Sequence, residues 1–261
     1  MINRFRMSKF SLETAGQFYA EHEGKPFFQN LTEFMSSDVC IGMELIADNA
    51  IAKWRQLIGP TNTQKAKEEA PNSLRALFGT DGTKNACHGS DSPDSAAREI
   101  AFWFAGENER RPMKTTAVLN NCTLCMIKPH IIRNNQLGQV WDMILQAGFE
   151  ISAADMFNLS RPMIEEFYGV YKGVLPEYVP LIEHMSNGPC IVLEVRQEDA
   201  VMSFRDFVGP YDPVIAKHLK PSSLRAQFGG DRVKNAVHCT DLPEDGNLEC
   251  QYFFETLQVN Q

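Results

Sequence analysis

The chain contains a long internal repeat. The segment SLRALFGTDGTKNACHGSD begins at Ser73, and SLRAQFGGDRVKNAVHCTD begins at Ser223, 150 positions later. Farther upstream the offset becomes 149, because Tyr19 pairs with Tyr168. One residue has therefore been gained in the second copy, between Tyr168 and Met185. A repeat of this length predicts two copies of one domain fold joined by a short connection.

The two copies differ at their starts. The second copy opens with CTLCMIKPH, and the position 149 residues before Lys128 would precede residue 1. We therefore expect the first domain to lack the N-terminal strand and helix of the second. The segment around Pro112 is polar and is typical of a linker. The expected organisation is a truncated domain over 1–105, a linker over 106–120 and a complete domain over 121–261.

The second copy alternates segments of strand and helix character. Apolar runs predict strands, apolar residues three and four apart predict helices, and Gly148 is a candidate helix C-cap. Expected strands are 122–127, 149–159, 190–195 and a short NAVHC strand; expected helices are 137–145, one beginning at Ser160 with Pro162 in its first turn, 200–208 and 248–257. This order predicts a mixed α/β (α+β) fold, namely two tandem ferredoxin-like α/β sandwich domains.

Composition excludes several classes of protein. The chain of 261 residues carries a net charge of −8, which argues against nonspecific nucleic-acid binding. The sequence has no apolar run of membrane-spanning length, so no membrane partner is expected. Seven cysteines without disulfide-type spacing favour a reducing, cytoplasmic compartment. Cys122 and Cys125 form a CxxC, but the run is apolar and no second CxxC follows, which favours a buried strand over a zinc or redox site.

His238 lies in the second copy of the repeated segment, among polar residues at the ends of expected elements. These are Lys128, Arg205, Arg225 and Asn235. Three cations and an amide suit a polyphosphate, because charge on phosphoryl oxygens requires donors that are already in place. A neutral imidazole is a competent nucleophile near neutral pH. Glu249, one helix later, is a candidate for fixing the tautomer of the ring.

Other readings of these residues remain open. A duplicated fold repeats its packing residues, so His238 can be a structural residue. The arginines and lysine can be solvated charges, and Glu249 can face water. His238 and Asp241 can ligate a metal, although no further histidine or cysteine has suitable spacing. No G-x-x-x-x-G-K-[ST] loop is present, which argues against a Walker-type phosphate cradle.

Four segments together resemble the signature of the nucleoside diphosphate kinase family in order and spacing. They are KPH after an apolar strand, SFRDFVGP with its arginine, SLRAQFG and KNAVHCTD. The resemblance covers nearly the whole chain, as one truncated and one complete kinase domain. It implies a ping-pong reaction in which a nucleoside triphosphate phosphorylates the histidine and a nucleoside diphosphate then accepts the phosphoryl group. It also implies Mg²⁺ bound through the nucleotide phosphates, with no protein side chain as metal ligand.

The resemblance implies roles for residues in both copies. In the second, His238 would be the nucleophile, Glu249 would orient it, and Thr240 stands where the family usually has serine. The nucleotide-binding residues would be Lys128, Tyr168, Arg205, Arg225, Asn235 and Thr240, with Lys128 also counted as catalytic. The first-copy counterparts would be Tyr19, Phe27, Arg55, Thr61, Arg75, Asn85, His88, Ser90 and Glu99.

The chain departs from the family pattern on the base side of the site. The family stacks the base on a phenylalanine, which the first copy keeps as Phe27 in KPFF. The second copy reads VLPEYVPL, where Tyr178 is a candidate platform. The family threonine near the phosphates is matched by Thr61 but replaced by Tyr211. Because the first copy has no counterpart of Lys128, we expect kinase activity only in the second domain.

The tandem arrangement resembles a divergent branch of the family that is associated with centrosomes and ciliary axonemes. This implies ATP, GTP and nucleoside diphosphates as ligands, and tubulin or other axonemal or centrosomal proteins as partners. The implied location is the cytoplasm, with the cytoskeleton, ciliary axoneme or centrosome as the site of action. Two other functions stay open. One is a structural microtubule inner protein or γ-tubulin complex regulator with little turnover, and the other is a nucleotide-binding regulator.

Overall fold

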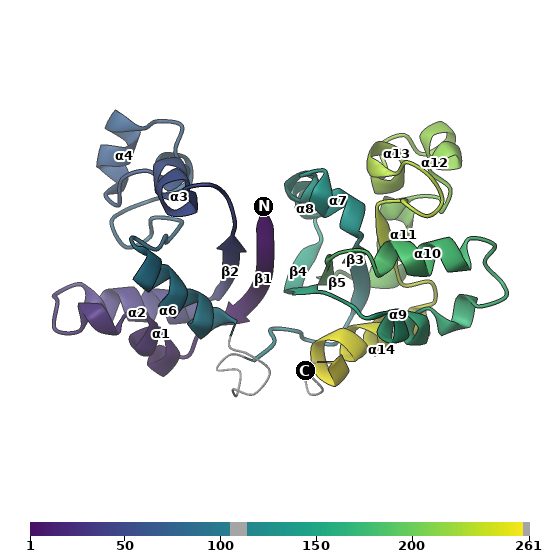
Figure 1. Ribbon diagram of the computed structural model, residues 1–261, viewed down its shortest axis with the longest axis horizontal. Coiled ribbons are helices and arrows are strands. Elements are labelled where there is room, and N and C mark those ends of the chain that lie inside the picture. The colour runs from purple at the N-terminus through teal and green to yellow at the C-terminus, as the bar shows by residue number, and fades with distance from the viewer. Residues whose placement is uncertain (105–113, 258–261) are drawn as a thin grey trace. The chain divides into compact units, whose positions relative to one another are not determined.

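The computed structural model describes residues 1–104 and 114–257 (Figure 1). The chain divides into a first unit, Met1–Lys114, and a second unit, Thr115–Gln261, which hold the two copies of the repeat. Most of the predicted linker, 106–120, lies outside the described residues. Each unit is therefore described by itself.

The second unit is built on an antiparallel sheet. Its strands are β3 (Cys122–Ile127), β4 (Glu150–Phe157), β5 (Cys190–Arg196) and β6 (Val237–Cys239). They lie in the order β4-β5-β3-β6, and each neighbouring pair is antiparallel. Every residue of β3 is buried, as the continuous apolar run CTLCMI predicts for a central strand. This is the predicted ferredoxin-like α/β sandwich.

Helices connect the strands, and α11 and α14 contact β3. The helices are α7 (Pro129–Arg133), α8 (Leu137–Gln146), α9 (Arg161–Phe167), α10 (Tyr178–Met185), α11 (Ala200–Val208), α12 (Pro213–Leu219), α13 (Leu224–Phe228) and α14 (Gly246–Gln251). Gly148 follows α8 with a φ of 84°, as a helix-terminating glycine does. The predicted last helix begins two residues early, at Gly246, and continues as a π-helical turn over Tyr252–Thr256. No helix in the described ranges is both long and apolar enough to cross a bilayer.

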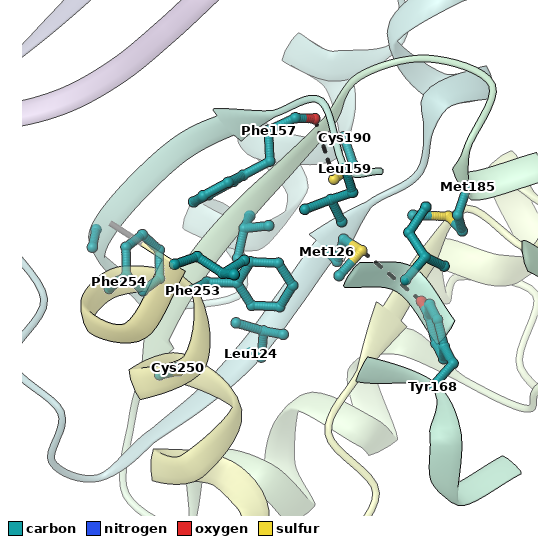
Figure 2. Close-up of a cluster of buried hydrophobic side chains, with 14 of the residues drawn as sticks. Leu124, Met126, Phe157, Leu159, Tyr168, Met185, Cys190, Cys250, Phe253 and Phe254 are labelled. Carbon is teal, nitrogen blue, oxygen red and sulfur yellow. Dashed lines mark hydrogen bonds between the residues drawn. The ribbon is translucent and has the colours of Figure 1, made fainter. Parts of the chain in front are cut away.

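Alternate residues of β3 point into one hydrophobic core of the second unit (Figure 2). Leu124 and Met126 are fully buried there, together with Phe157 of β4 and Phe253 after α14. Residues one position along a strand point to the opposite face, which places Cys125 away from this core. Both cysteines of the CxxC are buried, in agreement with the buried strand that was predicted.

The described residues of the first unit repeat the elements of the second from β4 onward, with no counterpart of β3, α7, α8 or β6. Its elements are α1 (Leu12–Phe18), α2 (Phe28–Ser37), α3 (Ala50–Ile58), α4 (Thr63–Glu69), α5 (Leu74–Phe78) and α6 (Pro93–Trp103), with β1 (Ile2–Lys9) antiparallel to β2 (Val39–Leu45). Ile41 and Met43 on β2 are 43% and 38% exposed, whereas their counterparts Ile191 and Leu193 on β5 are fully buried. The difference follows because β5 pairs with β3, and the first unit's described residues contain no counterpart of β3.

One tight turn recurs in both units beside the repeated segment. Gly209 ends α11 with a φ of 85°, and a Cβ placed on it would lie 2.3 Å from Ser223 Oγ. That hydroxyl caps α13 by accepting from the Ala226 amide at 3.4 Å. Gly59 makes the same approach to Ser73 in the first unit. Glycine is required at these positions for its positive φ and for the space it leaves.

We predict that Gly209→Ala lowers the free energy of unfolding of the second unit by about 1–3 kcal/mol, because the new Cβ meets Ser223 and adopts a strained φ. Gly230→Ala is the matched control, since a Cβ there meets nothing within 4 Å. Urea unfolding followed by hydrogen exchange of peptides from the second unit measures both variants. Equal stability of the two variants would contradict the prediction.

Candidate active site

His238 occupies the middle of β6 and is only 7% exposed. It is held there because β6 pairs with β3, with His238 opposite Met126. The rings of Phe167 and Tyr168 pack edge-on against the imidazole, with centroids 5.2 and 5.4 Å away. Neighbouring side chains therefore enclose the ring on the strand.

A carboxylate orients the imidazole. Glu249 on α14 places its Oε2 atom 3.1 Å from His238 Nε2. The hydroxyl of Thr240 donates to the same oxygen at 2.8 Å and accepts from the Leu124 amide at 3.0 Å. A carboxylate accepts hydrogen bonds, so this contact places the imidazole proton on Nε2. The lone pair is then on Nδ1, where the ring can act as a nucleophile.

Lys128 follows β3 directly and is 2% exposed. Its ammonium group donates to the Val233 carbonyl at 2.9 Å, and its backbone amide donates to the Ala236 carbonyl at 3.0 Å. Burial, followed by the nearby Arg225 guanidinium, lowers the pKa of Lys128 to about 7. Removal from water disfavours the charged form of an amine, so an anion near this group would restore its proton.

Arg225 and Asn235 are buried beside the same segment. Arg225 donates through Nη1 to the Gly209 carbonyl at 3.0 Å and through Nη2 to the Val237 carbonyl at 3.3 Å. Asn235 donates to the Tyr211 carbonyl at 3.0 Å. Two buried polar atoms here, Arg225 Nε and Asn235 Oδ1, have no hydrogen-bond partner. Buried polar groups are normally paired, so these two atoms have unused capacity that a polar ligand can fill.

Arg205, in the last turn of α11, is ion-paired with Asp241 and also donates to the Thr240 carbonyl at 3.4 Å. The Tyr171 hydroxyl donates to the other oxygen of Asp241. Burial and the hydrogen bond to Asp241 raise the pKa of the Tyr171 hydroxyl. The sequence placed Arg205 in the site but gave no sign of Tyr171, which lies on a short 3-10 turn and corresponds to His22 of the first unit.

Tyr168 lies beside His238, but its hydroxyl points into the core. The hydroxyl lies 3.9 Å from Met126 Sδ, and the residue is 2% exposed (Figure 2). Burial raises the pKa of this hydroxyl well above its ordinary value. The Tyr168 ring therefore packs against one side of the His238 imidazole. A contact of Tyr168 with nucleotide stays a prediction.

The first unit repeats the histidine arrangement in a more open setting. His88 Nε2 lies 2.8 Å from Glu99 Oε2, and the Ser90 hydroxyl donates to the same oxygen at 2.6 Å. Burial raises the pKa of Glu99, but the hydrogen bonds from His88 and Ser90 outweigh it and lower the pKa overall. The ring of Tyr19 packs edge-on against His88 at 5.9 Å. The His88 side chain is 40% exposed, against 8% for His238.

The predicted phosphate residues of the first unit line an open cavity. It has a volume of about 280 Å³, and its walls include Arg55, Gly59, Thr61 and Arg75. Arg75 donates to the Gly59 carbonyl at 2.9 Å and to the Thr61 hydroxyl at 3.3 Å. Asn85 donates to the Thr61 carbonyl at 3.4 Å. Arg55, Thr61, Arg75 and Asn85 therefore lie close together, and their contact with phosphate stays a prediction.

The base side differs between the units. Phe27, at the start of α2, is 46% exposed, with the Lys25 ammonium 5.9 Å from its ring centroid. In the second unit the extra residue lies between Gly173 and Pro176, so Glu177 is the counterpart of Phe27. Tyr178, the candidate platform, instead packs partly buried against the hydrophobic core.

Three possible metal ligands, Cys122, Glu194 and Cys250, lie together in the second unit, within 4.8 Å of one another. The Glu194 carboxylate already accepts from the backbone amides of Val118 at 2.7 Å and Leu119 at 2.6 Å. Its evident role is to anchor the segment that leads into β3. The sequence did not predict this cluster, whose members are far apart along the chain.

Comparison with known proteins relates both copies to one family. The family model described as nucleoside diphosphate kinase matches residues 1–109 and 121–259. Two curated relatives, both named nucleoside diphosphate kinase homolog 7, are 49% identical in rat and 47% identical in mouse over 98% of this chain. The chain spans about 65% of the length of these two relatives.

Bacterial proteins match as well. Nucleoside diphosphate kinase of Aquifex aeolicus is 50% identical over 105 residues, which are 40% of this chain and 74% of that protein. A crystal structure of the Aquifex aeolicus enzyme superposes with a TM-score of 0.50 at 37% identity, covering 52% of this chain and 96% of that one. The matches of sequence and fold agree, and the chain belongs to the nucleoside diphosphate kinase family.

Proposed function

We propose that the second unit transfers a phosphoryl group from a nucleoside triphosphate to a nucleoside diphosphate through a phosphohistidine on His238. One observation carries the proposal, namely the Glu249 carboxylate 3.1 Å from Nε2, which leaves the Nδ1 lone pair for attack. Two buried cations, Lys128 and Arg225, lie near His238 and can stabilise negative charge on phosphate. Membership in the family supports the reaction class.

The reaction has two displacement steps. In the first, the Nδ1 lone pair of His238 forms a bond to the γ-phosphorus, and the bond from that phosphorus to the bridging oxygen breaks, so a nucleoside diphosphate leaves. In the second, a terminal oxygen of another nucleoside diphosphate attacks the same phosphorus, and the N–P bond breaks. Glu249 retains its hydrogen bond to Nε2–H throughout and stabilises the positive charge on the ring.

The cations hold the triphosphate in place. Lys128, Arg205 and Arg225 would bind phosphate oxygens, and the unpartnered Arg225 Nε is one donor available for this. Arg205 would first exchange Asp241 for phosphate. Lys128, Arg205 and Arg225 are cations, which bind phosphate oxygens and not Mg²⁺. A Mg²⁺ ion therefore fits as part of the nucleotide, where it would neutralise phosphate charge.

The two units differ in the contacts that support the proposal. The first unit has the His88–Glu99 pair and the cavity beside Arg75. The second unit has the His238–Glu249 pair and, following β3, the buried cation Lys128, which can neutralise developing charge on the transferred group. The proposed enzyme is a phosphotransferase with its main nucleophile at His238.

We expect γ-labelled ATP to place acid-labile phosphate on the second unit. His238→Ala should remove the label, because no other group replaces Nδ1, and Glu249→Gln should slow labelling by about 10²-fold or more, because the tautomer is no longer fixed. His218→Ala, at an exposed histidine in α12, is the control. Peptide mapping of the label distinguishes residue 238 from residue 88. An unlabelled wild type, or equal labelling of His238→Ala, would refute the phosphohistidine.

Triphosphate binding at the second unit should take up a proton above pH 7. Lys128, with a pKa of about 7, is partly neutral in the free protein and becomes charged beside phosphate. Binding is then strongest below about pH 7 and weakens as pH rises. Calorimetry in buffers of different ionisation enthalpy measures the uptake. Lys128→Met should abolish it, and Lys172→Met, at an exposed lysine, should not; unchanged uptake in Lys128→Met would contradict the assignment.

The ciliary or centrosomal role is proposed from the sequence resemblance alone. A protein built into axonemal microtubules should stay with axonemes during extraction at moderate salt, because its contacts are buried in the lattice. Immunoblotting of the extracted and retained fractions measures this, with a soluble axonemal-compartment protein as the control. Release at modest ionic strength would count against a structural role and leave the enzymatic proposal standing.

A further inference from the structure

The two copies differ in a pair of residues on the base side of their sites. Phe27 of the first unit corresponds to Glu177 of the second, and Gly82 corresponds to Arg232. The first unit thus has an exposed aromatic ring at the first position, Phe27, and no side chain at the second, Gly82. The second has two side chains of opposite charge, so the change replaces an apolar slot with a possible ion pair.

The two charged residues of the second unit are in contact. Glu177 Oε1 lies 2.9 Å from Arg232 Nη1, and we call this pair the Glu177–Arg232 bridge. It joins the residue preceding α10 to the loop that leads into β6. The arginine is further held by Asp212, whose carboxylate lies 3.9 Å from its Nε. These contacts connect three segments of the chain, which contain Glu177, Asp212 and Arg232.

Tyr211 contacts the arginine of the bridge. It stands where the first unit has Thr61, and the centroid of its ring lies 5.7 Å from the guanidinium of Arg232 and 5.6 Å from that of Arg225. Arg225 belongs to the phosphate-binding set, so the Tyr211 ring links the bridge to that set. Cation–π contacts are favourable, so both guanidinium groups help to hold the Tyr211 ring in this place.

Burial supports closure on the base side. Glu177 Oε2 and Tyr211 Oη are both buried and without a hydrogen-bond partner. The Glu177 side chain is 21% exposed, whereas its counterpart Phe27 is 46% exposed and open to a stacking ligand. A planar base can stack on an exposed aromatic ring, but it gains nothing comparable from an ion pair that it must first separate.

We propose that the Glu177–Arg232 bridge closes the base side of the second site, so that this site recognises the triphosphate group and discriminates little between ATP and inorganic triphosphate. The inference rests on the proposed phosphate site at Lys128, Arg205 and Arg225. It makes Glu177 and Arg232 specificity-determining residues. Replacing them with the first unit's residues should then restore selectivity for the nucleoside.

The test compares ATP with inorganic triphosphate, both with Mg²⁺, on the whole chain. Hydrogen exchange read on peptides from 223–238 reports the second site, and peptides from 73–88 report the first site in the same sample. In the wild type, half-protection of the second site should need concentrations of the two ligands within about threefold of each other. In Arg232→Gly and in the double variant Glu177→Phe/Arg232→Gly, ATP should protect at about tenfold lower concentration, with inorganic triphosphate changed less than threefold.

Two further variants keep the result interpretable. Glu177→Gln breaks the ion pair without changing side-chain size. It should lower the ATP concentration for half-protection by about threefold. Glu150→Gln breaks the Glu150–Arg196 ion pair of the same unit, in which the two atoms lie 3.0 Å apart. It should leave the half-protection concentration of both ligands unchanged. Wild-type preference for ATP of tenfold or more, or no response of ATP to any bridge variant, overturns the bridge. Protection of 223–238 by neither ligand in any variant overturns the phosphate site itself, and both proposals with it.

Discussion

The pairing of β6 with β3 is the interaction on which the second site depends. It sets His238 opposite Met126. On the same segment, the Thr240 hydroxyl accepts a hydrogen bond from the Leu124 amide of β3. The carboxylate of Glu249 is then shared between this hydroxyl and the imidazole. Three side chains are thus positioned by one short ladder of backbone hydrogen bonds. Lys128, the residue after β3, is placed by the same strand.

The first unit shows what the repeated segment does without that strand. The segment KNACHGSD keeps the histidine and the hydroxyl residue, and α6 supplies the glutamate. The contacts of His88 and Ser90 with Glu99 still form. The residues around His88 form no strand, however, and its side chain is far more exposed than that of His238. Local sequence therefore suffices for the histidine–carboxylate pair. The lower exposure of the histidine in the second unit accompanies the pairing of its strand with β3.

Much of this was predictable from sequence, for identifiable reasons. Apolar runs and helical spacing located β3, β5, α8 and α11, because burial on one or both faces leaves a periodic pattern. The internal repeat drew attention to Arg205, Arg225, Asn235 and His238 and to their first-unit counterparts, since a duplicated fold keeps its geometry. The platform guess at Tyr178 was not supported, because the extra residue lies before Pro176 and moves Glu177 into the Phe27 position.

Contacts between loops left no such pattern. Arg232 reaches Glu177 across 55 positions of sequence, and Tyr171 reaches Asp241 across 70. Neither pair has a counterpart in the first unit, so the repeat could not reveal them.

Buried charge connects the two proposals for the second unit. Lys128 is held in a site that lowers its pKa to about 7, so the free site keeps an incompletely charged cation. Arg205 is meanwhile occupied by Asp241, and Arg232 by Glu177. Lys128 is therefore partly neutralised by deprotonation, and Arg205 and Arg232 are each paired with an internal carboxylate. A triphosphate must displace Asp241 from Arg205 and recharge Lys128, and its negative charge favours both changes. The nucleoside adds no charge, which is why selection by the phosphate chain follows from the same electrostatics that favour phosphotransfer.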